Sequence, residues 1–221
     1  MTLTIKHLIM GYMKQLFFEK IISCLSKVYN DSQKRKDIDL FRIKDVLDSL
    51  SQGQFENKIW AVEELQPYLK DKDACIVIGG WYGLISYLIK ESSFDGYVWN
   101  YDLDPVCKIY GEQLKIHDKV HFIDEDGLTF VNSETRNNEK KVLICTACEH
   151  IDQEDLNQML VKKNKDMVVC LQSNNYYDID SHINCHDSLD HFISELALRE
   201  IYYSGTKNWK GEYDRFMVIG R

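Results

Sequence analysis

Five short apolar runs, separated by longer mixed segments, constrain the fold of this chain more than any other feature of its sequence. Each run is rich in β-branched or aromatic residues and has the length of a strand. Strands that are apolar on both faces are typical of parallel sheets, whose neighbouring strands need long helical connections. The alternation predicts a doubly wound α/β sheet. The runs are ACIVIGG at 74–80, YVWNYD at 97–102, KVHFI at 119–123, KVLICT at 141–146 and DMVVCLQ at 166–172.

The two ends of the chain differ from this middle part. Near the C-terminus, REIYYSG at 199–205 and YDRFMVIG at 213–220 flank a short polar segment and predict an antiparallel hairpin at one edge of the sheet. Before the first strand, apolar residues recur at helical spacing over 5–29, 40–50 and 57–69. The predicted fold is a Rossmann-like mixed sheet of seven strands with an N-terminal helical extension.

Length and charge limit the classes of function. The 221 residues suit one main domain, and the net charge of −8 disfavours nucleic acid as a partner, because phosphate binding needs clustered Lys and Arg. Seven cysteines without a disulfide-like pattern favour a reducing compartment. No signal peptide or membrane span is recognisable, so we expect a soluble cytoplasmic protein without a membrane partner. The pattern makes no prediction of oligomeric state.

A glycine-rich turn follows the first strand. The segment Gly79-Gly80-Trp81-Tyr82-Gly83 connects that strand to an apolar helix, so backbone N–H groups at the helix start can face a ligand. Asp102 comes nineteen residues after Gly83, at the end of the second strand. A carboxylate in this place can accept both hydroxyl groups of a ribose. Turn and carboxylate together predict a site for a nucleoside-containing cofactor.

Over residues 73–220 the sequence resembles the class I S-adenosylmethionine-dependent methyltransferases. The resemblance rests on GGWYG after the first strand, YDLDP after the second, IDEDG after the third, TACEH after the fourth, and the terminal hairpin. It implies an S-adenosylmethionine-binding domain at 71–221, with 1–70 as a helical extension or lid. The cofactor-binding residues that it implies are Gly79, Gly80, Trp81, Tyr82, Gly83, Asp102, Asp126, Cys148 and Glu149.

Two positions depart from the pattern of that family. Val77 stands where the family has an acidic residue two positions before the first glycine, and Trp81 replaces the central glycine of the turn. Several stretches, including SQGQFENKIW and LQSNNYYDIDSHINC, resemble a phage and bacterial subgroup described only as methyltransferase-like. The resemblance therefore implies the cofactor more firmly than the reaction.

Candidates for acceptor chemistry follow the fourth and fifth strands. His150 and His182 are each a candidate base, although packing or loop capping would explain either histidine equally well. A polar run after the fifth strand lies where open α/β sheets bind ligands. The predicted substrate-binding residues are Gln172, Asn174, Asn175 and Tyr176 from this run, with Gln54 and Lys58 from the helical extension.

Cysteine and histidine side chains near the ends of the fourth and fifth strands have the chemistry of zinc ligands. The set is Cys145, Cys148, His150, His182, Cys185 and His186. Cys145 belongs to a buried strand, where cysteine acts as a small apolar residue. We therefore predict no metal site from the sequence.

The favoured function is a methyltransferase that uses S-adenosylmethionine and acts on a small polar molecule. The same cofactor would also serve a lyase or an aminocarboxypropyl transferase. An inert nucleotide-binding module that regulates a partner is a third interpretation. A nicotinamide-dependent dehydrogenase is a fourth, disfavoured by the hairpin and by the incomplete G-x-G-x-x-G pattern.

Overall fold

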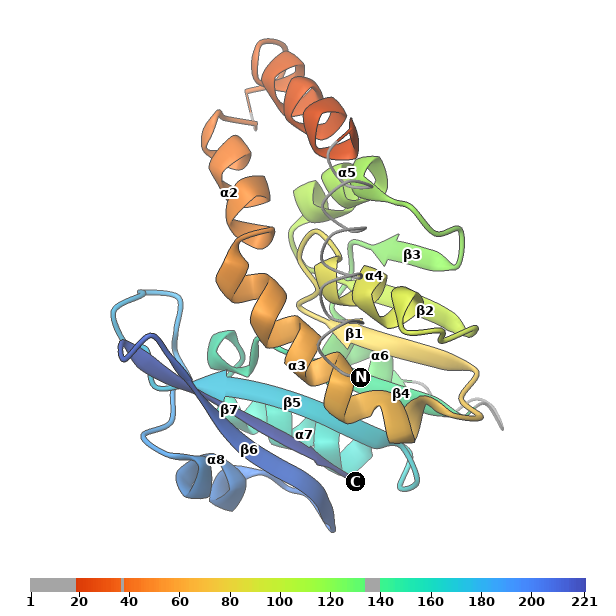
Figure 1. Cartoon of the computed structure of the whole chain (residues 1–221), viewed down its shortest axis with the longest axis vertical. Helices are drawn as coiled ribbons and strands as arrows, with labels where there is room; N and C mark the ends of the chain where they lie inside the picture. The colour runs from red at the N-terminus through yellow and green to blue at the C-terminus, as the bar shows by residue number, and fades with distance from the viewer. Residues whose placement is uncertain (1–18, 37, 134–139) are drawn as a thin grey trace.

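The computed structural model describes residues 19–36, 38–133 and 140–221. It contains a seven-stranded sheet in the order β3-β2-β1-β4-β5-β7-β6 (Figure 1). The first five strands are parallel, and β7 pairs antiparallel with both β5 and β6. The predicted fold class is confirmed. The strands are β1 Ala74–Ile78, β2 Tyr97–Tyr101, β3 Val120–Ile123, β4 Lys141–Cys145, β5 Val168–Asn174, β6 Ile201–Trp209 and β7 Tyr213–Gly220.

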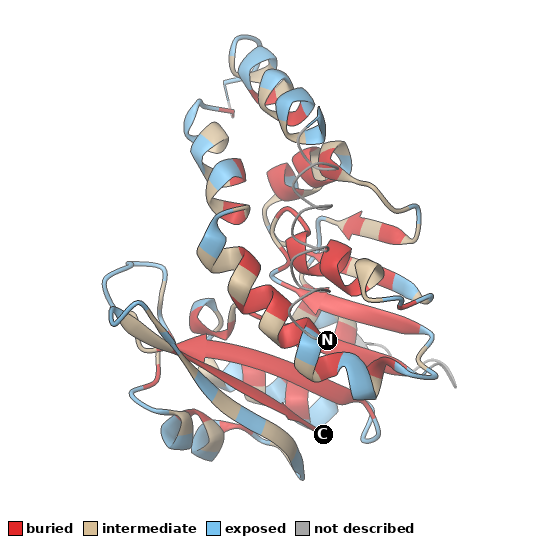
Figure 2. Cartoon of the chain, viewed as in Figure 1, coloured by how far each residue is buried: buried red, intermediate tan, exposed pale blue. Residues whose placement is uncertain are grey.

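Apolar side chains on alternate positions of the central strands form two hydrophobic clusters, one on each face of the sheet. Val77 and Ile144 belong to one cluster, whereas Ile76 and Leu143 belong to the other. Every residue of β1, β4 and β5 is buried, as the red central strands in Figure 2 show. Burial on both faces explains why these strands read as uninterrupted apolar runs.

The helices divide between the two faces. One hydrophobic cluster takes residues from the helical residues 19–32 and from α2, α3, α4 and α5, and the other takes residues from α6, α7 and α8. Their bounds are α2 Phe41–Ser49, α3 Gln52–Leu69, α4 Leu84–Glu91, α5 Pro105–Leu114, α6 Gly127–Ser133, η1 Cys148–His150, α7 Gln153–Lys162 and α8 Leu189–Glu195. Among the described helices, none combines the length and apolar character needed to cross a bilayer.

The helical extension packs into the main core. Phe55, Val62 and Leu65 of α3 belong to the same buried cluster as residues of β1 and α4. Polar contacts also join α3 to the sheet: Trp60 Nε1 donates to Tyr203 Oη at 3.0 Å, and Gln172 Nε2 donates to the Asn57 carbonyl at 3.3 Å. The part of the predicted first helix before residue 19 lies outside the described residues.

The hairpin is longer than the sequence indicated. β6 continues to Trp209, so most of the polar segment 206–212 is strand, and β5 continues to Asn174. Antiparallel pairing with β7 explains both extensions, because Asn174 pairs with Arg215 and Thr206 pairs with Phe216. The polar run that we expected to leave β5 as a loop is therefore largely part of the strand.

The glycine-rich turn is tightly packed against β2. Gly79 and Gly83 have φ values of +60° and +85°, which favour glycine, and Trp81 has φ +49°. A Cβ at Gly80 would lie 2.0 Å from Asn100 Oδ1. Asn100 is buried and fixed, since its Oδ1 accepts from Ser86 Oγ at 2.7 Å and its Nδ2 donates to the Trp81 carbonyl at 3.3 Å. Gly80 is required by this close approach.

We predict that Gly80→Ala lowers the free energy of unfolding by about 2–4 kcal/mol, because Asn100 must give up its hydrogen bonds to admit the methyl group. Gly211→Ala is the matched control. Gly211 has φ +80°, but a Cβ added there would meet nothing within 4 Å, so only backbone strain of about 1 kcal/mol applies. Urea unfolding of the three proteins checks the difference. Equal losses in the two variants would contradict the steric explanation.

Candidate functional site

A cavity of about 730 Å³ opens at the carboxyl ends of the parallel strands. Its walls come from β1 and β2 on one side, from β4 and β5 on the other, and from the helical extension and the start of β7. The predicted site residues that line it are Gln54, Lys58, Gly79, Trp81, Asp102, Asp126, Glu149, His150, Asn174, Tyr176 and His182. Residues from segments far apart in sequence therefore meet at one surface.

Asp102, which follows β2, is oriented by two backbone N–H groups. Its Oδ2 accepts from the Trp81 N–H at 2.8 Å, and its Oδ1 accepts from the Asp104 N–H at 3.0 Å. Burial raises the pKa of the Asp102 carboxyl, and these two backbone hydrogen bonds oppose that shift. Each carboxylate oxygen can accept more than one hydrogen bond. Asp102 can therefore accept hydrogen bonds from hydroxyl groups of a ligand while it holds the glycine-rich turn.

The segment after β3 supplies a second carboxylate to the same side of the cavity. Asp126 accepts from the Leu128 N–H at 3.0 Å and from Thr129 Oγ1 at 2.5 Å, so its side chain caps the start of α6. Gly127, Leu128 and Tyr101 line the cavity beside it. This part of the wall combines an apolar surface with polar edges, which suits a heterocyclic ring.

On the opposite side, Glu149 is the centre of a buried polar network. Its Oε1 accepts from Asn174 Nδ2 at 2.7 Å and from Arg215 Nη2 at 3.2 Å. Arg215 Nη1 also donates to the Thr146 carbonyl at 3.4 Å. Glu149 Oε2 is buried and has no hydrogen-bond partner among the residues that the structure describes. A buried carboxylate oxygen without a partner is costly unless a ligand completes it.

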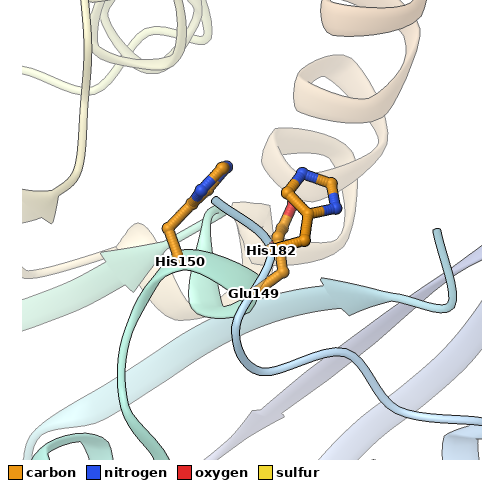
Figure 3. Close-up of side chains that lie close together, drawn as sticks. All are labelled: Glu149, His150 and His182. Atoms are coloured by element: carbon orange, nitrogen blue, oxygen red, sulfur yellow. The ribbon is translucent and has the colours of Figure 1, made fainter. Parts of the chain in front are cut away.

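His150 and His182 lie next to Glu149, one at the end of η1 and the other in the loop between β5 and α8 (Figure 3). Their ring centroids are 4.7 Å apart and the rings are nearly perpendicular, at 82°. His150 Nδ1 lies 2.9 Å from the Ser181 carbonyl oxygen, and His182 Nδ1 lies 2.6 Å from the Tyr176 carbonyl oxygen. The structure therefore brings together the two histidines that the sequence offered as alternative bases.

Lys58 enters the cavity wall from α3. Its Nζ donates to Gln54 Oε1, one turn earlier on the helix. Burial lowers the pKa of Lys58 to about 7, the positive charge of Arg215 acts in the same direction, and the negative charge of Glu149 opposes both effects. The amine can therefore change its protonation state near neutral pH.

Six other predicted residues do not line the cavity. Gly80 and Gly83 face Asn100 and Phe122, and Tyr82 and Cys148 are buried in the core. Gln172 and Asn175 bind the protein itself: Gln172 donates to the Asn57 carbonyl, and Asn175 Oδ1 accepts from the Asp214 N–H at 2.7 Å. Their contacts in this arrangement are structural.

Sequence reasoning missed several residues of the cavity wall. Arg215 is a charged residue directly before the apolar run FMVI of a strand, which is a usable signal for a buried ion pair. Tyr213 precedes it on β7, and Asp45 and Asp48 come from α2. Nothing in the spacing of these residues relates them to the strand ends, because their position depends on how α2 and the hairpin pack.

Solved structures of other proteins share the fold of this chain. No protein-family model and no curated protein matches this sequence. The plantazolicin methyltransferase BpumL in complex with SAH is 14% identical, with a TM-score of 0.58 over 93% of this chain and 99% of that chain. A mutant of MtNAS in complex with S-adenosylmethionine is 12% identical, with a TM-score of 0.56 over 97% and 77%. The chain has a Rossmann-like methyltransferase fold.

The same fold also matches a protein whose name describes another reaction. A probable spermidine synthase from Corynebacterium glutamicum is 12% identical, with a TM-score of 0.53 over 75% of this chain and 63% of that chain. Because one fold supports several reactions, the reaction has to be argued from the side chains of the cavity.

We predict that Lys58→Met changes the pH dependence of stability. The pKa of about 7 in the folded state lies below the ordinary lysine value of 10.5, so between these values the unfolded chain binds more protons and native stability rises with pH. The variant lacks this contribution. The stability gain of Lys58→Met over the native protein should therefore be largest below pH 7, where it is constant, and shrink by about 1.4 kcal/mol per pH unit between pH 7 and pH 9.

Denaturant unfolding between pH 6 and pH 9 measures that difference. Lys44→Met is the control, because Lys44 is exposed and pairs with Asp48, so it stays charged in both states over this range. A stability difference for Lys58→Met that is as flat with pH as that of the control would contradict the lowered pKa of Lys58.

Proposed function

We propose that the cavity binds S-adenosylmethionine and that the protein transfers its methyl group to a small polar acceptor. The proposal rests on one observation: Gly79 and Asp102, at the ends of β1 and β2, share one cavity with Glu149 and His150 beyond β4 and with His182 beyond β5. The first pair has the positions of a nucleoside-binding site in a doubly wound sheet. The second group has side chains suited to acceptor chemistry. Similar structures named for bound S-adenosylmethionine and SAH support the choice of cofactor.

The charge of the cavity wall also supports this cofactor. Its carboxylates outnumber its basic Lys and Arg side chains: Asp45, Asp48, Asp102, Glu125, Asp126 and Glu149 stand against Lys58 and Arg215. The sulfonium centre of S-adenosylmethionine is positively charged, so an acidic cavity favours it. The same excess of carboxylates disfavours a nucleic acid acceptor, whose phosphates would be repelled.

In this proposal Asp102 accepts the ribose hydroxyl groups, and Leu128 with Asp126 lies against the adenine. The methyl group would then point toward Glu149, His150 and His182, where the acceptor binds. Transfer breaks the bond between sulfur and the methyl carbon while the acceptor atom forms a new bond to that carbon. Each histidine donates its Nδ1 proton to a carbonyl, so a neutral ring has Nε2 free to accept the acceptor's proton.

The residue at position 77 gives a reason to test a second reaction with the same cofactor. Val77 is buried, and its side chain cannot accept a hydrogen bond from the amino end of the ligand's amino-acid tail. A different pose of that tail would favour cleavage or transfer of the aminocarboxypropyl group, and the spermidine synthase match shows that the fold is not limited to proteins named methyltransferases.

All seven cysteines are unpaired, which is consistent with a reducing compartment such as the cytoplasm.

We predict that Asp102→Ala weakens binding of S-adenosylmethionine and S-adenosylhomocysteine at least tenfold, or about 1.4 kcal/mol, because the ribose hydroxyl groups lose their acceptor. Calorimetric titration measures this loss. Asp124→Ala is the matched control, since Asp124 follows the neighbouring strand but pairs with Lys108 outside the cavity wall. Circular dichroism verifies that both variants are folded. Equal affinities for the two variants would remove Asp102 from the site.

Mass spectrometry of the incubated cofactor separates the two reactions. Methyl transfer converts S-adenosylmethionine into S-adenosylhomocysteine in the presence of an acceptor, whereas loss of the aminocarboxypropyl group leaves methylthioadenosine. We expect S-adenosylhomocysteine. Accumulation of methylthioadenosine above the rate of spontaneous breakdown would contradict methyl transfer as the main reaction.

A further inference from the structure

Glu149, His150 and His182 form a compact set of metal-ligand side chains. One ligand atom from each, a carboxylate oxygen and two imidazole nitrogens, lies within 4.8 Å of the other two. Figure 3 shows the three side chains lying close together, two from η1 and one from the loop after β5. All three residues also line the cavity, so an ion held between them would lie at the cavity wall.

The hydrogen bonds of the two histidines fix their tautomers. A carbonyl oxygen can only accept, so the contacts of His150 Nδ1 with Ser181 and of His182 Nδ1 with Tyr176 require a proton on each Nδ1. In the neutral rings, Nε2 then carries a free lone pair. Donation from the other ring nitrogen to a carbonyl is the arrangement that orients metal-binding histidines in proteins.

The carboxylate of Glu149 has one oxygen engaged and one oxygen available. Asn174 and Arg215 both donate to Oε1, whereas Oε2 has no partner in the part of the chain that the structure describes. The residue is only 3% exposed. An oriented, buried oxygen that lacks a hydrogen bond is an independent sign that something binds there.

Two hydrogen bonds from Asn184 hold the segments that carry the three ligands in place before anything binds. The Asn184 N–H donates to the Glu149 carbonyl at 3.0 Å, and Asn184 Nδ2 donates to Gln153 Oε1 at 2.9 Å. These contacts fasten the loop that carries His182 to the segment that carries Glu149 and His150. A site whose ligands are already positioned loses little entropy on binding.

We propose that Glu149, His150 and His182 bind a divalent transition-metal ion of the Mn²⁺, Fe²⁺, Co²⁺ or Zn²⁺ type. Two imidazoles with one carboxylate are a set that such ions prefer, while Mg²⁺ and Ca²⁺ prefer oxygen ligands alone. Three protein ligands leave at least one coordination position open, as in catalytic sites. The ligand set differs from the Cys and His set considered in the sequence, because Cys145 and Cys148 are buried.

This site deepens the proposed function and, in its catalytic role, rests on it. Arg215 already offsets the charge of Glu149, so a bound divalent ion favours an anionic oxygen as its next ligand. The implied acceptor is a small molecule with a hydroxyl group. The ion lowers the pKa of that hydroxyl, its proton passes to solvent, and the oxygen takes the methyl group as the sulfur–carbon bond breaks. The histidines then act as ligands and not as bases.

Metal binding is tested first without S-adenosylmethionine, so that its outcome is independent of the cofactor. The full-length protein is freed of metal with a chelator and titrated with Co²⁺ and with Zn²⁺, using visible absorption and calorimetry. We expect one ion per chain, with Co²⁺ bands that lack thiolate charge transfer. His150→Ala and His182→Ala should each weaken binding by about tenfold or more. The control His117→Gln, which alters a histidine paired with Glu91, should bind as the native protein does.

A second measurement does not depend on the variants. Pulsed electron paramagnetic resonance of native protein loaded with Cu²⁺ should detect two imidazole ligands. Absence of stoichiometric binding, binding that both histidine variants retain at native affinity, or a spectrum without imidazole nitrogen would each overturn the metal site. The titration of S-adenosylmethionine onto metal-free protein separately tests the cofactor, so failure of one proposal does not imply failure of the other.

Discussion

The reversal of strand order at β1 is the constraint on which the site depends. The chain first adds β2 and β3 on one side of β1 and then returns to place β4 and β5 on the other. The connections that leave the carboxyl ends of β1 and β4 therefore diverge, and the space between them cannot be filled by either. Gly79 and Ala147, at the two edges of this divergence, both line the cavity. The cavity follows from the topology, while its chemistry comes from the side chains placed around it.

The fold must also provide hydrogen-bond partners for a set of buried polar groups at the carboxyl edge of the sheet. Glu149, Arg215 and Asn174 form a network from η1, β7 and β5, and Lys58 adds an amine whose pKa burial lowers. Breaking a buried ion pair by removing one partner typically costs about 3–5 kcal/mol. Such a network is a weak source of net stability, so its presence at the cavity is better explained by binding. The antiparallel hairpin contributes Arg215 and thus joins the sheet edge to the site.

Much of this arrangement could be predicted from the sequence, because the central strands are buried on both faces. The apolar runs identified the five parallel strands, and two further runs near the C-terminus identified the hairpin. The turn at Gly79 together with Asp102 indicated the cofactor side of the cavity. The role of Gln172 could not be anticipated, because its polar side chain binds the Asn57 carbonyl only when α3 packs across β5. The ends of β5 and β6 were misplaced, since pairing with β7 continues through residues that have weak strand propensity alone. Asp45 and Arg215 reach the cavity through long-range packing, which local periodicity does not report.

We propose that S-adenosylmethionine binds at the carboxyl ends of β1 and β2 with its methyl group directed toward Glu149, His150 and His182. A crystal structure of the protein grown with S-adenosylhomocysteine would test this binding mode. We expect ribose hydroxyl groups on Asp102, adenine beside Leu128 and the sulfur atom facing the Glu149 side of the cavity. Density for the ligand at another place, or an empty cavity at saturating ligand, would contradict this binding mode.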